Sequence, residues 1–543
     1  MFTLLPFRFP QPPTLRPSKA FGLPPLFLEF GIVAILLALL TLGFFWQILL
    51  TSSTWMPAGG GDLAPFLYPN YVFAAQHLRQ GVIPLWNPHL YSGAPFAADI
   101  QSGLFYPLNL LIFLLVPNLT YEWLEYLAIF HFWLAGVMMY VCLRLLRPPT
   151  ADREPLTGDQ RPATGDSPNI QNAPRTTHYA PRSPHHTSRS SPHALHLHPL
   201  AALAGAIAFE FSDLFIVHFG NLNMIAVAAW LPLVFLLFHK SLQRRSLGLA
   251  AAAGVVLAVA TLAGHIQITL FILLTLGLYS LWYLRFTIYT ARLSLWGDLR
   301  FTIYRFFTSR LTPHHFHPSS LLLHPFLTLL VTIGLSALLL FPAYEMSRYT
   351  PRAELPYGEA AAFSLHPAQL IGLLIPNYFG RDPALHWGPW ERVETGYIGI
   401  MTLLLALIGL RLYQGRLKYF FVGLGLIALA LAWGNFTPLH GWLYALLPGF
   451  DQLRAPARFI LLLDFSLATL AAFGLNCLLQ GLDAAAQVSL RKMLRGLTWV
   501  LGGLIVVAAP LSYFALLITQ DRNPAIFARA GAAAAGVTTF AIF

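Results

Sequence analysis

Apolar runs long enough to cross a bilayer as a helix, which takes about 20 residues, alternate along this chain with polar segments of very unequal length. Predicted membrane spans cover residues 27–50, 123–146, 200–215, 222–238, 247–263, 266–284, 321–341, 396–412, 419–433, 459–479 and 497–518. The apolar stretch at 104–116 is shorter and contains Pro107 and Asn109, so we interpret it as a re-entrant or interfacial piece. The pattern predicts an all-α, polytopic helical membrane protein with about 11–12 spans.

The composition supports a membrane environment. Hydrophobic residues make up 56% of the chain and charged residues 10%, with a mean hydropathy of +0.61, whereas an ordinary soluble domain carries about 25% charge. Basic cytoplasmic loops explain the formal net charge of +11, which therefore does not indicate a nucleic-acid partner. Both cysteines, Cys142 and Cys477, lie in apolar segments, which excludes a disulfide framework and a cysteine zinc site.

The basic residues also orient the chain. With the N-terminus in the cytoplasm, the inner loops carry the excess of Lys and Arg, as at Lys240, Arg244 and Arg245, and such loops resist translocation. The predicted organisation is a cytoplasmic N-terminal tail at 1–26, membrane helices at 27–147 with an outer loop at 51–106, a disordered cytoplasmic linker at 148–198, membrane helices at 199–284, a basic cytoplasmic loop at 285–319, membrane helices at 320–518 with outer loops at 342–395 and 434–456, and an outer segment at 519–543 that begins a further, truncated helix.

The first outer loop contains the leading candidate for a catalytic residue. Asp62 follows Gly59, Gly60 and Gly61, and glycines let a backbone turn tightly and approach a ligand closely. The alternative is an ordinary loop aspartate that caps the short helix predicted to follow, with Pro65 in its first turn. The sequence by itself leaves these two interpretations equally favoured.

The rest of that loop is aromatic and polar. Trp86 and His89 suit the faces and hydroxyls of a sugar, although aromatic residues also anchor proteins at the bilayer interface. Asp99 and Gln101 are candidates for binding hydroxyls or a metal ion, or for holding the loop closed.

Several charged residues near other predicted outer ends are candidates for binding a substrate. Arginine binds phosphate through two parallel hydrogen bonds, so Arg348 is a candidate and Arg454 and Arg458 are better ones, with surface salt bridges or contact with lipid headgroups as the alternatives. The remaining candidates for substrate binding are His265, Glu345 and Glu394. The histidine-rich stretches near 185–198 and 314–317 reflect biased composition rather than a metal site.

An ordered series of strings resembles YfhO-like bacterial membrane proteins, which are similar to GT-C-type glycosyltransferases. These strings include GDLAPFLYPNYVFAAQHLRQGVIPLWNPHLYSGAPFAADIQSG, HFGNLNMIAVAAWLPL, GHIQ, FPAYEMSRYT and FDQLRAPARF. The resemblance extends from the first predicted span to about residue 479. It implies a GT-C-like architecture in a bacterial cell membrane, and a chain that continues beyond residue 543.

The resemblance also implies a reaction. A sugar would pass from a polyprenyl-phosphate donor to a glycan, polymer, lipid or protein acceptor on the outer face, with inversion. Asp62 matches the GT-C catalytic aspartate and would act as general base, and Asp99 would orient the acceptor or help to bind a divalent cation. Arginines such as Arg348, Arg454 and Arg458 would hold the phosphate. Some GT-C enzymes need a divalent cation, Mg²⁺ or Mn²⁺, and others do not, and the sequence does not decide. The alternatives are a transporter or flippase of lipid-linked sugars, and a non-catalytic envelope assembly factor.

Overall fold

The structure is a computed structural model that describes residues 25–51, 53–56, 61–90, 92–146, 196–305, 318–350, 355–376, 378–379, 396–447, 449–519, 531 and 534–535. Most of the predicted N-terminal tail, nearly all of the predicted linker, and Glu394 lie outside the described residues. The same holds for residues 306–317 of the predicted basic loop, for 351–354 and 380–395 of the second outer loop, and for most of the predicted segment at 519–543.

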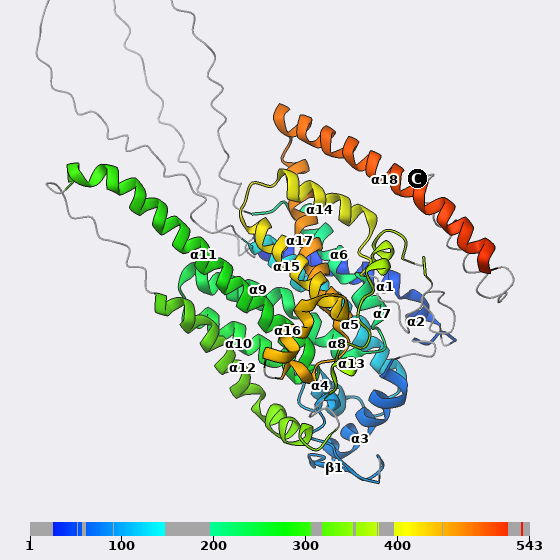
Figure 1. The fold of residues 1–543 in the computed structure, drawn as a ribbon. Helices are drawn as coiled ribbons and strands as arrows, with labels where there is room; N and C mark the ends of the chain where they lie inside the picture. Colours follow the sequence, from blue (N-terminus) through cyan, green and yellow to red (C-terminus); the bar gives the residue numbers. More distant parts are fainter. Residues whose placement is uncertain are drawn as a thin grey trace, which may run out of the picture.

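The described chain is mostly helical (Figure 1). The helices are α1 (Pro25–Phe44), α2 (Trp46–Leu50), η1 (Leu63–Leu67), α3 (Tyr68–Arg79), η2 (Ile100–Ser102), α4 (Pro107–Leu115), α5 (Tyr121–Leu145), α6 (Pro199–Glu210), α7 (Asp213–Val217), α8 (Leu222–Ala228), α9 (Leu231–Arg244), α10 (Leu247–Leu262), α11 (Ile266–Arg305), α12 (Pro318–Ser347), α13 (Tyr357–Ala360), η6 (Pro367–Leu373), α14 (Ile400–Leu412), α15 (Leu417–Ala432), η7 (Gly434–Phe436), α16 (Pro438–Leu446), η8 (Phe450–Gln452), η9 (Pro456–Phe459), α17 (Ile460–Leu479) and α18 (Ala484–Thr519). Two short strands, β1 (Trp86–Asn87) and β2 (Ala94–Pro95), pair antiparallel.

Within this described part, eight helices are long and apolar enough to cross a membrane, and three shorter apolar helices accompany them. The length and composition of these helices thereby confirm the prediction of an all-α, multi-pass membrane protein. The short apolar stretch at 104–116 forms α4, a helix of 9 residues. At a rise of about 1.5 Å per residue, such a helix does not reach across a hydrocarbon core about 30 Å thick.

Helix α17 is at the centre of the helical body (Figure 1). Within Pro456–Leu479, which contains this helix, 89% of the most apolar stretch is buried. Small residues let neighbouring backbones approach it. A Cβ added at Gly409 of α14 would lie 2.1 Å from the Leu470 carbonyl oxygen, and one at Gly474 of α17 would lie 1.9 Å from the Leu405 carbonyl oxygen. Close packing of this kind is how helices associate without a hydrophobic driving force. The segment that leads into α17 is therefore held on a rigid element.

At one end of the bundle, a buried arginine ties three segments together. Arg144 of α5 pairs with Glu29 of α1, with Nη2–Oε2 at 2.8 Å, and it also donates to the Leu197 carbonyl just before α6. The Tyr140 hydroxyl donates to the same Glu29 carboxylate at 2.6 Å. The charges therefore satisfy each other, as buried charges in an apolar environment require.

The observed elements differ from the predicted ones in several places. Helix α12 extends beyond the predicted span at 321–341 at both ends, and α18 begins at Ala484 rather than at residue 497. The predicted span at 200–215 is interrupted between α6 and α7, where the Asp213 N–H donates to the Tyr397 carbonyl at 2.9 Å instead of to its own helix. Helix α11 continues past the predicted end at residue 284 to Arg305. No proline occurs in residues 285–305, and arginine and leucine favour helix, so the helix continues into the segment predicted as a basic loop.

Candidate functional site

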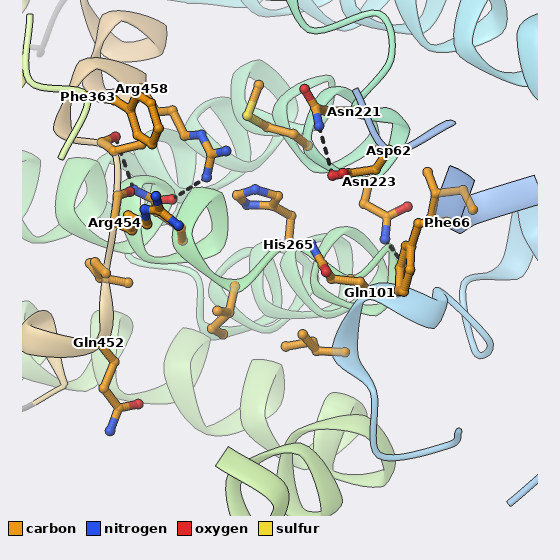
Figure 2. Close-up of a pocket in the computed structure, with 18 residues that line it drawn as sticks. Asp62, Phe66, Gln101, Asn221, Asn223, His265, Phe363, Gln452, Arg454 and Arg458 are labelled. Carbon is orange, nitrogen blue, oxygen red and sulfur yellow. Dashed lines mark hydrogen bonds between the residues drawn. The ribbon is translucent and has the colours of Figure 1, made fainter. Parts of the chain in front are cut away.

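A polar pocket with a cavity volume of about 260 Å³ opens where several helices begin or end. Its lining comes from the start of η1, the turn before α8, the junction of α10 and α11, and the segment that leads into α17. The described residues that line it are Asp62, Phe66, Leu67, Ile100, Gln101, Asn221, Asn223, Met224, Gly264, His265, Ile266, Gln267, Phe363, Gln452, Leu453, Arg454, Ala455 and Arg458 (Figure 2).

Asp62 occupies one end of this pocket and is exposed to it. Its backbone N–H donates to the Gly220 carbonyl at 2.9 Å, and its Oδ2 accepts a hydrogen bond from Asn221 Nδ2, also at 2.9 Å (Figure 2). Gly61 precedes it with φ +82°, and a Cβ there would lie 2.8 Å from the Gly220 Cα. Only glycine accepts both that backbone conformation and that contact.

The alternative role of Asp62 as a helix cap is not observed. The residue stands at the N-terminus of η1, but its side chain makes no capping hydrogen bond. Its carboxylate instead bonds to Asn221, which is 159 residues away in the chain. The loop aspartate is therefore oriented by a tertiary contact rather than by its own helix.

A network of neutral side chains forms the floor near Asp62. Asn223 Nδ2 donates to the Gln101 carbonyl at 2.5 Å, and the Tyr71 hydroxyl donates to Asn223 Oδ1 at 3.4 Å. Asn109 Nδ2 in turn donates to the Tyr71 hydroxyl at 2.8 Å and to the Gly103 carbonyl at 2.9 Å. The network joins α3, α4, η2 and α8 and holds Gln101 in place at the pocket.

Replacing Tyr71 by Phe tests this network. We expect the free energy of unfolding to fall by about 1–2 kcal/mol, because the buried amides of Asn109 and Asn223 both lose a partner. The measurement is thermal unfolding of the purified protein in detergent. Tyr68→Phe is the matched control, since no hydrogen bond involves the Tyr68 hydroxyl within the described chain. Equal stabilities of the two variants would contradict the role of Tyr71.

The opposite end of the pocket is basic. Arg458 Nη1 donates to Gln267 Oε1 at 2.9 Å, and the Arg454 guanidinium lies 5.0 Å from the centre of the Phe363 ring (Figure 2). His265 lies between these arginines and Asp62 in Figure 2, and its Nδ1 accepts from the Ile268 N–H at 3.4 Å. Because Nδ1 is the acceptor, the neutral ring carries its proton on Nε2.

The electrostatic character of the pocket changes from one end to the other. One carboxylate and several side-chain amides occupy the Asp62 end, while two guanidinium groups and the N-terminus of α11 occupy the other. A helix N-terminus carries partial positive charge that adds to that of the arginines. The basic end therefore suits an anion, and the Asp62 end suits hydroxyl groups.

Five of the predicted site residues meet in this pocket, namely Asp62, Gln101, His265, Arg454 and Arg458. The other described candidates do not line it. Trp86 and His89 are exposed around the β1–β2 ribbon, and Glu345 and Arg348 are exposed near the C-terminal end of α12. Asp99 caps η2 by accepting from the Gln101 N–H at 3.0 Å.

Sequence reasoning did not select five polar or aromatic lining residues, namely Phe66, Asn221, Asn223, Phe363 and Gln452. It noted Gln267 beside His265 at the outer junction of two predicted spans, but assigned it no role. Asn221 and Asn223 fall within NLN, and Gln267 within GHIQ, so each lies beside a helix end. Amide side chains placed between two apolar runs are the signal that points to them. Phe363 has no such signal in the sequence.

Asp62 is the one carboxylate among the described lining residues. Within the described chain, no group of three or more His, Cys, Asp or Glu side chains is arranged to hold a metal ion. Asp62 is the lining carboxylate that would hold a Mg²⁺ or Mn²⁺ ion, and Mg²⁺ commonly binds through one or two carboxylates while it keeps several waters.

The chain was compared with known protein families, curated proteins and solved structures. No protein-family model, no curated protein and no solved structure matches the chain.

Proposed function

We propose that the protein is a membrane glycosyltransferase that moves a sugar from a polyprenyl-phosphate donor to a cell-envelope acceptor. The observation that carries the proposal is one pocket with a carboxylate at one end and two arginines at the other. A lipid-linked sugar phosphate has matching chemistry, because an anion is joined to a ring rich in hydroxyl groups. The resemblance to YfhO-like and GT-C-type proteins supports the same reaction.

In the proposed reaction, Asp62 acts as general base. Its Oδ1 accepts the proton of an acceptor hydroxyl while Asn221 holds Oδ2. The acceptor oxygen attacks the anomeric carbon of the sugar from the face opposite the phosphate. A new glycosidic bond forms, the bond from the anomeric carbon to the phosphate oxygen breaks, and that oxygen leaves with the electron pair. Attack from the opposite face inverts the configuration.

The arginines have the complementary role. Negative charge grows on the phosphate as the bond to the sugar breaks, and Arg454 and Arg458 stabilise it electrostatically. His265 also lines the pocket, between its two ends (Figure 2). Phosphate is a good leaving group when its charge is stabilised, so the reaction needs no strong general acid.

The proposed location is a bacterial cell membrane, with the N-terminus in the cytoplasm and the pocket on the extracytoplasmic side. The distribution of basic residues supports this orientation, because Lys240, Arg244 and Arg245 lie around the end of α9, away from the pocket-lining start of α8. Lipid would surround the apolar faces of α1 and α12, where large hydrophobic side chains are exposed. The pocket at the helix ends would then meet the donor phosphate at headgroup depth.

Reconstitution into proteoliposomes tests the proposal. The vesicles contain a panel of radiolabelled undecaprenyl-phosphate hexoses as donors and a cell-envelope extract as the acceptor source. We expect label to appear in an acceptor fraction in a protein-dependent manner. Passage of labelled lipid across the bilayer without transfer would identify a transporter or flippase instead, and the absence of both activities over the whole panel would favour an assembly factor.

A further inference from the structure

Gln267, in the first turn of α11, connects the two arginine-bearing positions of the pocket. Its Oε1 accepts from Arg458 Nη1 at 2.9 Å, and its Nε2 donates to the Arg454 carbonyl at 2.5 Å and towards the Ala455 carbonyl at 3.5 Å. Arginine has only donors and a carbonyl is only an acceptor, so a rotated amide would face a like partner on both sides. The network thus permits a single orientation of this amide, and the side chain is 6% exposed.

The turn that Gln267 holds has an unfavourable backbone. Ala455 has φ +59° and ψ 72°, in the left-handed region that residues with a Cβ rarely occupy. Phe363, which lies against the Arg454 guanidinium, has φ +60°, and its carbonyl accepts from the Ala457 N–H at 3.3 Å. Two of the four non-glycine residues with positive φ in the described chain therefore meet at the basic end. Such conformations persist only where surrounding contacts hold them.

We propose that Gln267 is a positioning residue that sets the spacing of Arg454 and Arg458 for a phosphate group. The Oε1 of its amide orients the Arg458 guanidinium, and the Nε2 holds the strained turn that contains Arg454. The inference rests on the proposed function, because it takes a lipid-linked phosphate as the anion. Gln267 acts through the two arginines and makes no bond to the reacting atoms.

A purely structural role for Gln267 would predict a different result. It would lower thermal stability and leave anion affinity unchanged among the molecules that remain folded. A positioning role predicts lower affinity for a phosphate, a more reactive Arg458, and recovery when the strain at Ala455 is removed. Glycine at 455 adopts positive φ without the Cβ penalty, so the turn would persist without its hydrogen bond to Gln267.

The test uses the full chain in detergent with farnesyl phosphate as the probe, and with farnesol and inorganic phosphate as comparisons. Gln267→Leu should weaken farnesyl phosphate binding about 10- to 100-fold, as expected for loss of a hydrogen bond to a charged group. Phenylglyoxal, which modifies arginine, should react faster with Arg458 in this variant, as measured by mass spectrometry. The double variant Gln267→Leu/Ala455→Gly should recover part of the affinity. Gln414→Leu makes the same substitution at an exposed site outside the pocket and should match the wild type.

The outcomes separate the inference from the proposed function. Wild-type affinity and an unchanged Arg458 modification rate in Gln267→Leu would overturn the positioning role. If the wild type bound farnesyl phosphate and farnesol equally well, the pocket would not recognise a lipid phosphate, and the proposed function would be refuted. The phenylglyoxal modification rate of Arg458 would then be the remaining test of the role of Gln267. If inorganic phosphate bound as tightly as farnesyl phosphate and displaced it, the ligand would be a free phosphate rather than a lipid.

Discussion

The variant Asp62→Asn is expected to transfer sugar about 100- to 10,000-fold more slowly than the wild type, the range that a general base contributes. The asparagine oxygen can still accept the hydrogen bond from Asn221 Nδ2, so the loop should keep its position. What the substitution removes is the ability to take a proton from the acceptor hydroxyl. The measurement is the single-turnover transfer rate at saturating donor, in the proteoliposomes described above.

Asp99→Asn is the comparison for Asp62→Asn. Asp99 lies outside the pocket lining and accepts a hydrogen bond from the Gln101 N–H, and an asparagine oxygen can accept it equally well. We therefore expect its transfer rate to remain within about tenfold of the wild type, a change below that of a general base. A wild-type rate in Asp62→Asn, or a larger loss in Asp99→Asn than in Asp62→Asn, would refute the assignment of the base.

The variant Gly264→Ala is expected to lose about 3 kcal/mol or more of the free energy of unfolding, because two unfavourable effects combine. Gly264 joins α10 to α11 with φ +94°, a backbone conformation that is strained for alanine. The added Cβ would also lie 2.2 Å from the Ile100 carbonyl oxygen and 3.1 Å from Asn223 Nδ2. Both neighbours line the pocket, so we also expect farnesyl phosphate binding to be lost. Thermal unfolding in detergent measures the first effect.

Gly277→Ala is the matched control for Gly264→Ala, since it makes the same substitution within α11. A Cβ at Gly277 would meet no atom within 4 Å, and alanine favours a helix interior over glycine by about 1 kcal/mol. This variant should be as stable as the wild type or slightly more so. If Gly264→Ala unfolded at the same temperature as Gly277→Ala, this result would contradict the close contact between the α10–α11 junction and Ile100.

The apolar pattern predicted the membrane-spanning helices because a spanning helix needs only a long apolar run, which is a local property of the chain. It predicted the continuous helices well, as at α5, where the expected 123–146 compares with Tyr121–Leu145. It did not predict the interruption between α6 and α7. There the Asp213 N–H bonds to Tyr397, a partner remote in sequence, and no local pattern records such a bond.

For the pocket, the sequence by itself determined which charged residues lie beside helix ends, including Asp62, Arg454 and Arg458. Only the tertiary structure decided that these three share one cavity, while Glu345 and Arg348 stay apart from it. It also supplied Asn221 and Gln267, whose partners Asp62 and Arg458 lie 159 and 191 residues away. The physical reason is that hydropathy and charge are properties of neighbours along the chain, whereas a pocket consists of hydrogen bonds between residues that only the packing of helices brings together.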